Sequence, residues 1–261
     1  MNQLKHLIIF TDLDGCLLNK HDYQWQDAEE CLLRLVDLQV PVVLASSKTV
    51  AEMQKIATEV PFVPAPFIAE NGGAICWGPL DTEGDAEILC TGIPRPEILD
   101  VLTGLKSRFR FRSFQDLGFE GVMKSTDLEA TNAALAMQRQ STEPLLWDDS
   151  AEKRLEFEQI LKRHKLTLTR GGRFWHVAGH TSKGLALQQV LGRYNDDEAI
   201  SVVIGDSQID QSMLNVAHIP IGIRVGEILS VSIQCPPGIV PPSECARGWA
   251  EAVNEVLDRF V

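Results

Sequence analysis

The chain lacks several features that define whole classes of protein. Its 261 residues include six cysteines, but none are spaced as C-x-x-C, so the sequence indicates neither a disulfide framework nor a zinc site. No apolar run approaches the roughly 20 residues that a membrane span needs, and the run within residues 1–10 is too short for a signal peptide. We therefore expect a cytoplasmic protein with reduced thiols and no membrane partner.

Basic residues are also scarce. The chain has 24 Lys and Arg against 36 Asp and Glu, a net charge of -12 at pH 7. Such a surface repels phosphate backbones, so we expect no nucleic-acid partner. It also repels phosphorylated small molecules, so a phosphate site would have to be built locally from a cation, lysines and backbone N–H groups. The hydrophobic fraction of 44% is enough to bury a core without structural disulfides or metal.

Near both ends of the chain, short apolar runs alternate with segments whose apolar residues recur at helical spacing. In the N-terminal part, strands are predicted at 7–11, 41–45 and 67–69, and helices at 26–38 and 49–58. In the C-terminal part, helices are predicted at 182–191, 209–216 and 243–260, and strands at 200–204 and 219–223. This alternation is typical of a parallel sheet with helices on its faces. The predicted fold class is α/β, with a Rossmann-like parallel-sheet core.

The middle of the chain has a different texture. Residues 78–85 are polar and rich in turn formers, which favours a linker or hairpin loop. Beyond them, short strands mix with helices near 96–109, 127–138 and 151–162, and Ser125 or Thr126 would cap the second of these helices. We therefore predict a core domain of residues 1–80 and 180–261, interrupted by an inserted α+β cap domain of residues 81–179.

Four acidic residues follow two of the predicted strands. Asp12 and Asp14 come after the first strand, and Asp206 and Asp210 after the strand at 200–204. Ligands of parallel α/β sheets bind beyond the carboxyl ends of the strands. If these two strands are neighbours, the four carboxylates converge, and a hard divalent cation such as Mg²⁺ would offset their repulsion. These four residues are the predicted metal ligands.

Two lysines are placed to complete a phosphate site. Lys48 follows Ser46 and Ser47 just past the second strand, and Lys183 begins the helix before the late strand. A serine hydroxyl and the free N–H groups of the helix at 49–58 would add donors for an anion. Asp12, at the strand end, is the predicted nucleophile, and Asp14 would give a proton to the leaving alkoxide and later take one from water.

These segments together resemble the four motifs of the haloacid dehalogenase superfamily of phosphatases. The motifs, in order, are D-L-D-G-C-L-L at 12–18, the strand end at Ser46, Lys183-Gly184, and G-D-S-Q-I-D at 205–210. The resemblance implies the fold of that superfamily and the catalytic roles of Asp12, Asp14 and Lys183. It also implies that Ser46 and Lys183 bind the phosphoryl group, and that Asp206 and Asp210 lie on magnesium.

Finer features are similar to the mannosyl-3-phosphoglycerate phosphatase group. They are A-S-S-K-T at 45–49, A-E-N-G-G at 69–73 and R-G-G-R-F-W-H at 170–176. The resemblance implies that substrate-binding residues include Ser47, Lys48, Glu70, Asn71, Gly72, Gly171, Gly172 and Arg173. It implies a small substrate, a phosphorylated sugar or glycosyl-phosphoglycerate, and a role in mannosylglycerate biosynthesis, where the product is a compatible solute. Whether the protein is a monomer or a homodimer stays open.

Two positions depart from the superfamily pattern. Cys16 stands where threonine is usual, and Ile209 stands where asparagine usually orients groups around the nucleophile and the lysine. Three functions follow as hypotheses. The first is hydrolysis of mannosyl-3-phosphoglycerate or its glucosyl analogue through an aspartyl phosphate. The second is another reaction on the same scaffold: a sucrose-phosphate or other sugar-phosphate phosphatase, or a phosphohexomutase. The third is a regulatory protein that binds sugar phosphates and has weakened catalysis, for which Ile209 is the sequence support.

Overall fold

The computed structural model describes residues 6–61, 66–77, 86–171, 173–194 and 198–260. Its central element is a parallel sheet in the order β11-β10-β1-β2. These strands are β1 (Leu7–Thr11), β2 (Val42–Leu44), β10 (Ile200–Gly205) and β11 (Ile219–Gly222). Continuous apolar runs form them because both faces of the sheet are covered. The α/β fold class is confirmed, and β1 and β10 are neighbours, with Thr11 in register with Ile204.

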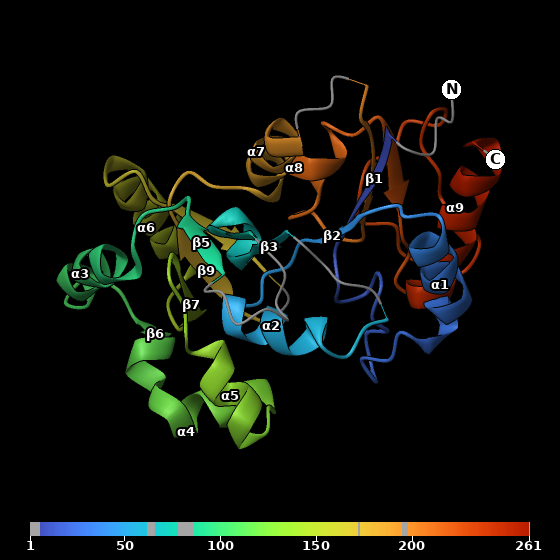
Figure 1. The fold of residues 1–261 in the computed structure, drawn as a ribbon. Coiled ribbons are helices and arrows are strands. Elements are labelled where there is room, and N and C mark those ends of the chain that lie inside the picture. Colours follow the sequence, from blue (N-terminus) through green and yellow to red (C-terminus); the bar gives the residue numbers. More distant parts are fainter. Residues whose placement is uncertain (1–5, 62–65, 78–85, 172, 195–197, 261) are drawn as a thin grey trace.

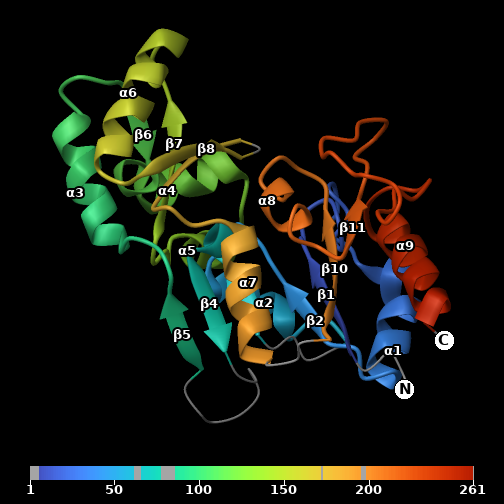
Figure 2. The same cartoon turned by 90° about the horizontal axis from the view of Figure 1, so that it is seen from above.

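Helices cover both faces of this sheet, as Figure 2 shows. Leu7 and Ile9 belong to one apolar cluster and Ile8 and Phe10 to another, because successive strand residues point to opposite faces. On the first face lie the 3₁₀ turn Gln26–Ala28, α1 (Glu29–Asp37), α2 (Val50–Ala57) and α9 (Cys245–Phe260). On the second face lie α7 (Lys183–Tyr194) and α8 (Gln211–Leu214). All helices predicted for the core occur, with ends shifted by a few residues.

A hairpin extends the sheet toward the middle of the chain. A parallel bridge between Ala45 and Ile68 places β3 (Phe67–Ala69) beside β2. Antiparallel pairing then adds β4 (Ala74–Trp77) and β5 (Glu87–Cys90). The predicted linker at 78–85 lies outside the described residues. Since β5 pairs with β4, the sheet of the core reaches at least Cys90, and the domain boundaries remain a proposal.

The inserted segment forms a second layered unit, drawn on the left of Figure 1. Its antiparallel sheet has the order β6-β7-β9-β8. These strands are β6 (Phe111–Ser113), β7 (Thr142–Trp147), β8 (Thr167–Arg170) and β9 (Trp175–Ala178). Its helices are α3 (Arg95–Leu105), α4 (Phe114–Thr126), α5 (Ala130–Ala136) and α6 (Ala151–Arg163). Phe157 on α6 packs against Phe109, Phe111 and Trp147, so the cap has an apolar core of its own.

One part of the cap was predicted wrongly. Helix α4 was missed, and Ser125 and Thr126 close it instead of capping the next helix, which begins at Ala130. The α4 sequence holds two glycines, and its backbone leaves the helical region at Gly118, where φ is 61°. Glycine lowers helix propensity, so the local signal was weak, and packing of Phe114 and Val122 stabilises the helix instead.

Two general features complete the description. The six cysteines carry free thiols. Among the described residues, no helix is both long enough and apolar enough to cross a membrane.

Candidate active site

Two acidic residues meet where β1 and β10 end. Asp12 follows β1 and Asp206 follows β10, and an oxygen of each lies within 4.8 Å of the other and of the Cys16 sulfur. Gly15 makes this approach feasible: its φ is +94°, and a Cβ there would stand 2.7 Å from Asp206 Oδ2. The expected convergence of two distant loops is therefore present.

A buried lysine connects this pair to the last acidic residue. Lys183 Nζ donates hydrogen bonds to Asp12 Oδ1 and, at 2.6 Å, to Asp210 Oδ1. Asp210 Oδ2 accepts from the backbone N–H of Asp206 at 3.2 Å and from the N–H and hydroxyl of Ser207 at 3.0 and 2.7 Å. Asp210 is fully buried with its oxygens engaged, so the geometry gives it a positioning role in place of the predicted direct metal contact.

The charges of the carboxylates in this cluster are only partly balanced by Lys183. Burial is the largest cause that raises the pKa of Asp12, and the neighbouring carboxylates add to it against Lys183. Burial, followed by repulsion from Asp210, raises the pKa of Asp206 to about 7. Burial alone would lower the pKa of Lys183, but Asp12 and Asp210 outweigh burial and raise it. The single ammonium of Lys183 thus faces the three buried carboxylates of Asp12, Asp206 and Asp210.

The donor set fits a hard divalent cation. Asp12 and Asp206 both line an open cavity and offer converging carboxylate oxygens, the ligands that Mg²⁺ prefers. The third member of the group, Cys16, is buried, and burial raises the pKa of its thiol well above the usual value. A neutral thiol is a poor ligand for magnesium. The carboxylates of Asp12 and Asp206 are therefore the residues that fit a Mg²⁺ ion.

The loop after β2 brings a second lysine to the cavity. Lys48 Nζ lies 2.9 and 2.7 Å from the two oxygens of Asp14, and both side chains line the cavity. Burial would lower the pKa of Lys48, but Asp14 more than offsets this and the pKa is raised. Ser47 also lines the cavity, whereas Ser46 is almost fully buried and its hydroxyl accepts from the Lys48 N–H at 3.3 Å.

The turn after β3 has one residue that lines the cavity and another that contacts the cap. Asn71 lines the cavity, and its Oδ1 is buried without a partner among the described residues. Glu70, in contrast, is fully buried: its carboxylate accepts from the backbone of Gln140 and Ser141 and from the Thr142 hydroxyl at 2.5 Å. The structure therefore makes Glu70 a link from core to cap, instead of bringing it to the cavity as predicted.

Gly72 also has a structural function in this turn. Its φ is +94°, and a Cβ there would stand 2.3 Å from the carbonyl oxygen of Ser182. Only glycine allows the turn to lie this close to the start of α7. Gly72 therefore positions Lys183, and it is not among the residues that line the cavity.

The glycine turn of the cap also reaches the cavity. Gly171 and Arg173 line it, while Gly172 lies outside the described residues. The Arg173 guanidinium binds the backbone oxygen of Ser125 and, at 2.9 Å, Asp127 Oδ2. Arg173 is thus placed at the cavity with a partner on the cap.

Arg139 and His176, which were not among the predicted site residues, line the same cavity of about 410 Å³. Arg139 donates to the Thr142 hydroxyl at 2.7 Å and to the Ser47 carbonyl, and its Nε has no hydrogen-bond partner among the described residues. His176 Nδ1 has no partner in the part of the chain that the structure describes, and burial, with the positive charge of Arg139, lowers the His176 pKa to about 3. His176 was visible in the R-G-G-R-F-W-H motif, but no local pattern marked Arg139.

Ile209 lines the cavity beside Asp206 and Ser207. Its side chain offers no hydrogen bond, which agrees with the concern raised by the missing asparagine. Lys183 is nevertheless held from two sides, by Asp12 and Asp210. The substitution therefore leaves the lysine in place.

Comparison with known proteins identifies the family to which this chain belongs. Residues 9–227 match the model of the haloacid dehalogenase-like hydrolases. The chain belongs to this family. A relative from Persephonella marina, named glucosyl-3-phosphoglycerate/mannosyl-3-phosphoglycerate phosphatase, is 33% identical over 97% of this chain and 98% of its own length. The predicted enzyme class, a hydrolase of this superfamily, is confirmed.

Solved structures agree with the fold. A haloacid dehalogenase-like hydrolase from B. subtilis superposes with a TM-score of 0.67 at 17% identity, covering 97% of this chain and 99% of that one. One from Bacteroides thetaiotaomicron gives a TM-score of 0.67 at 18% identity, covering 98% and 100%. At this identity the likeness shows the fold alone.

Proposed function

We propose that the protein is a Mg²⁺-dependent phosphoric monoester hydrolase that converts a glycosyl-3-phosphoglycerate, mannosyl-3-phosphoglycerate above all, to glycosylglycerate and phosphate. The observation that carries the proposal is the convergence of Asp12 and Asp206 beside Lys183 in a cavity roofed by the cap. The name of the P. marina relative supports the substrate class. The same proposal places the enzyme in the cytoplasm, in the formation of a compatible solute.

The chain's own residues account for the reaction. An oxygen of Asp12 attacks phosphorus, an aspartyl phosphate forms, and the bond from phosphorus to the glycerate oxygen breaks. Asp14 supplies the proton that the leaving alkoxide needs, and later takes one from the water that hydrolyses the aspartyl phosphate. Lys183 orients Asp12 and balances negative charge through both steps. When bound at Asp12 and Asp206, Mg²⁺ would offset the charge of the phosphate.

The ion pair of Lys48 and Asp14 has a consequence for this scheme. The Lys48 ammonium, 2.7 Å from Asp14 Oδ2, holds this carboxylate in one place. A dianionic substrate in the same cavity competes for Lys48. Binding of substrate would therefore release Asp14 for its part in proton transfer.

The cavity carries five basic residues against four acidic ones, Asp12, Asp14, Glu52 and Asp206, so with a bound divalent cation it would be clearly net positive, which supports a substrate with more than one negative group. Lys20, Lys48, Arg139 and Arg173 line it in addition to Lys183. The Nε of Arg139 is buried and has no hydrogen-bond partner within the described ranges, and it belongs to a planar guanidinium, a group that binds carboxylates in a two-point arrangement. We assign the glycerate carboxylate to this side of the cavity, with Arg139 as its main partner.

A phosphate-release panel tests the proposal. The purified protein is assayed with Mg²⁺ or EDTA on mannosyl- and glucosyl-3-phosphoglycerate, sucrose phosphate and hexose phosphates, with isomerisation monitored. We expect Mg²⁺-dependent release with a preference for the glycosyl-3-phosphoglycerates, and loss of turnover by several orders of magnitude in Asp12→Asn with an unchanged circular dichroism spectrum. Turnover that survives in Asp12→Asn would exclude the nucleophile assignment. Preference for another sugar phosphate, isomerisation, or no turnover at all would each replace the proposed substrate.

A further inference from the structure

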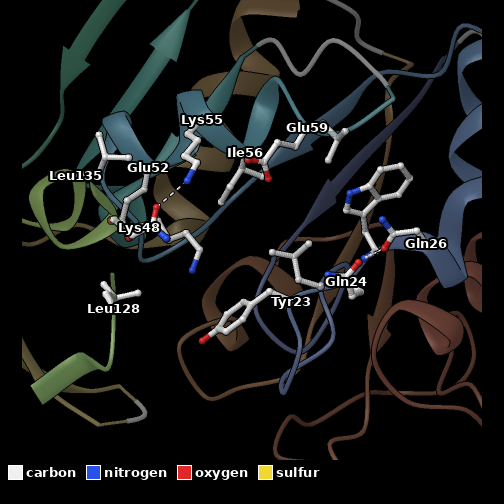
Figure 3. A pocket seen from close by; sticks show the side chains of 14 residues that line it. Tyr23, Gln24, Gln26, Lys48, Glu52, Lys55, Ile56, Glu59, Leu128 and Leu135 are labelled. Atoms are coloured by element: carbon white, nitrogen blue, oxygen red, sulfur yellow. Dashed lines mark hydrogen bonds between the residues drawn. The ribbon is translucent and has the colours of Figure 1, made fainter. Parts of the chain in front are cut away.

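A second cavity, of about 440 Å³, opens beside the catalytic one. It lies between the 23–26 segment and α2 of the core and residues 128–135 of the cap (Figure 3). Four residues line both cavities: Tyr23, Lys48, Glu52 and Leu128. The two spaces are therefore adjacent, and a substrate with its phosphate at Asp12 can extend into the second one.

The lining of this second cavity differs from that of the catalytic cavity. Its charged residues are balanced, with Lys48 and Lys55 against Glu52 and Glu59. Between them lie the amides Gln24, Gln26 and Asn132 and the apolar side chains Leu18, Ile56, Val60, Leu128 and Leu135. Amides can bond hydroxyl groups while apolar and aromatic surfaces cover C–H groups. This combination suits a neutral ligand with many hydroxyl groups, such as a pyranose ring.

Tyr23 stands at the junction of the two cavities in an unusual conformation. Its φ is +57°, and the residue is 57% exposed, with Lys48 Nζ 5.5 Å from the ring centroid. A left-handed backbone at a bulky residue is strained and persists where the surroundings enforce it. Here two hydrogen bonds close the turn, Asn19 N–H to the Gln24 carbonyl at 2.9 Å and Tyr23 N–H to the Asn19 carbonyl at 3.0 Å.

Core and cap are joined along the wall of this cavity. Lys55 Nζ donates to Asn132 Oδ1 at 2.8 Å, and the Thr49 hydroxyl donates to the Leu135 carbonyl at 2.9 Å. A ligand in the cavity would touch both domains at once. Its binding energy would therefore also hold the cap on the core.

We propose that this second cavity is the subsite for the glycosyl part of the leaving group, with the Tyr23 ring as the surface on which the sugar stacks. The inference rests on the proposed phosphatase function. It adds an assignment of the residues that favour a glycosylated substrate over 3-phosphoglycerate without the sugar. The phosphate lies at Asp12, the carboxylate on the Arg139 side, and the sugar against Tyr23, α2 and the cap.

The test compares two substrates that differ only in the sugar, a glycosyl-3-phosphoglycerate and 3-phosphoglycerate, with Mg²⁺ present. The variants are Tyr23→Ala, which removes the stacking surface, and Ile56→Trp, which fills the cavity. Tyr23→Phe keeps the ring, and Leu33→Trp on α1, where Leu33 is 47% exposed, is the matched control for an added indole. We expect Tyr23→Ala and Ile56→Trp to lower the ratio of kcat/KM, glycosylated over bare, about tenfold through KM, as loss of an aromatic contact does. Tyr23→Phe and Leu33→Trp should keep the wild-type ratio.

The subsite would be overturned by an unchanged ratio in both Tyr23→Ala and Ile56→Trp, whether turnover is retained or falls equally on both substrates in folded protein. In either case wild-type turnover of the glycosylated substrate would leave the proposed function standing. Absence of wild-type turnover on both substrates would instead count against the proposed function.

Discussion

We expect that replacing Asp206 stabilises the folded protein and abolishes its activity. The Asp206 pKa of about 7 lies above the ordinary 3.8, because the carboxyl is buried and faces Asp210. Between these two pH values the folded protein holds a proton that the unfolded chain has lost, so the free energy of unfolding falls as the pH rises through this window. Each pKa unit corresponds to about 1.4 kcal/mol, so a shift of roughly three units sets an upper limit of about 4 kcal/mol.

Asp206→Asn replaces this carboxyl with an amide that cannot ionise. At pH 8, without metal, we expect the variant to be more stable than the wild type by about 2–4 kcal/mol, a rise in Tm of roughly 5–10 °C for a chain of this size. At pH 5 only the part of the window from 3.8 to 5 has been crossed, so the gain should shrink to roughly 1–2 kcal/mol. Adding Mg²⁺ at pH 8 should raise the Tm of the wild type and leave that of the variant unchanged, and phosphate release should be lost.

The assay is thermal unfolding in EDTA and in Mg²⁺ at both pH values, with Asp37→Asn, an exposed carboxyl on α1, as the matched control. A destabilised Asp206→Asn at pH 8, or a gain of the same size at pH 5, would refute the reasoning from burial and repulsion. A Tm shift with Mg²⁺ that survives the substitution would refute the placement of the ion.

Two further predictions concern the cap. Glu70→Gln puts an amide where a carboxylate accepts from Gln140, Ser141 and Thr142, so we expect a loss of about 2–3 kcal/mol in urea unfolding, and unchanged stability would contradict the clamp. Arg139→Met should raise KM for 3-phosphoglycerate substrates at least tenfold, because a charged hydrogen-bonding pair is lost, and should change KM for a hexose phosphate much less. An equal effect on both substrates would refute the assignment of the glycerate carboxylate to Arg139.

Much of the core could be predicted because its signals are local. Residues 7–10 are all apolar, which favours a strand buried on both faces. Helix α2 carries its own capping box, with Thr49 and Glu52 bonded to each other. The cap was harder. Helix α4 contains glycines and has a kink at Gly118, so its stability comes from contacts with residues far along the chain.

The candidate site divides in the same way. The sequence by itself placed Asp12 and Asp206 directly after two predicted strands, because the apolar runs end there. The structure showed that these strands are neighbours and that Gly15 permits the close turn. Only the tertiary structure decided the partners of the other charges: Glu70 binds the cap backbone, Lys48 pairs with Asp14, and Arg139 reaches the cavity. Periodicity and turn chemistry act over a few residues, whereas these partners lie 34 to 92 positions apart, and packing of the two domains selects them.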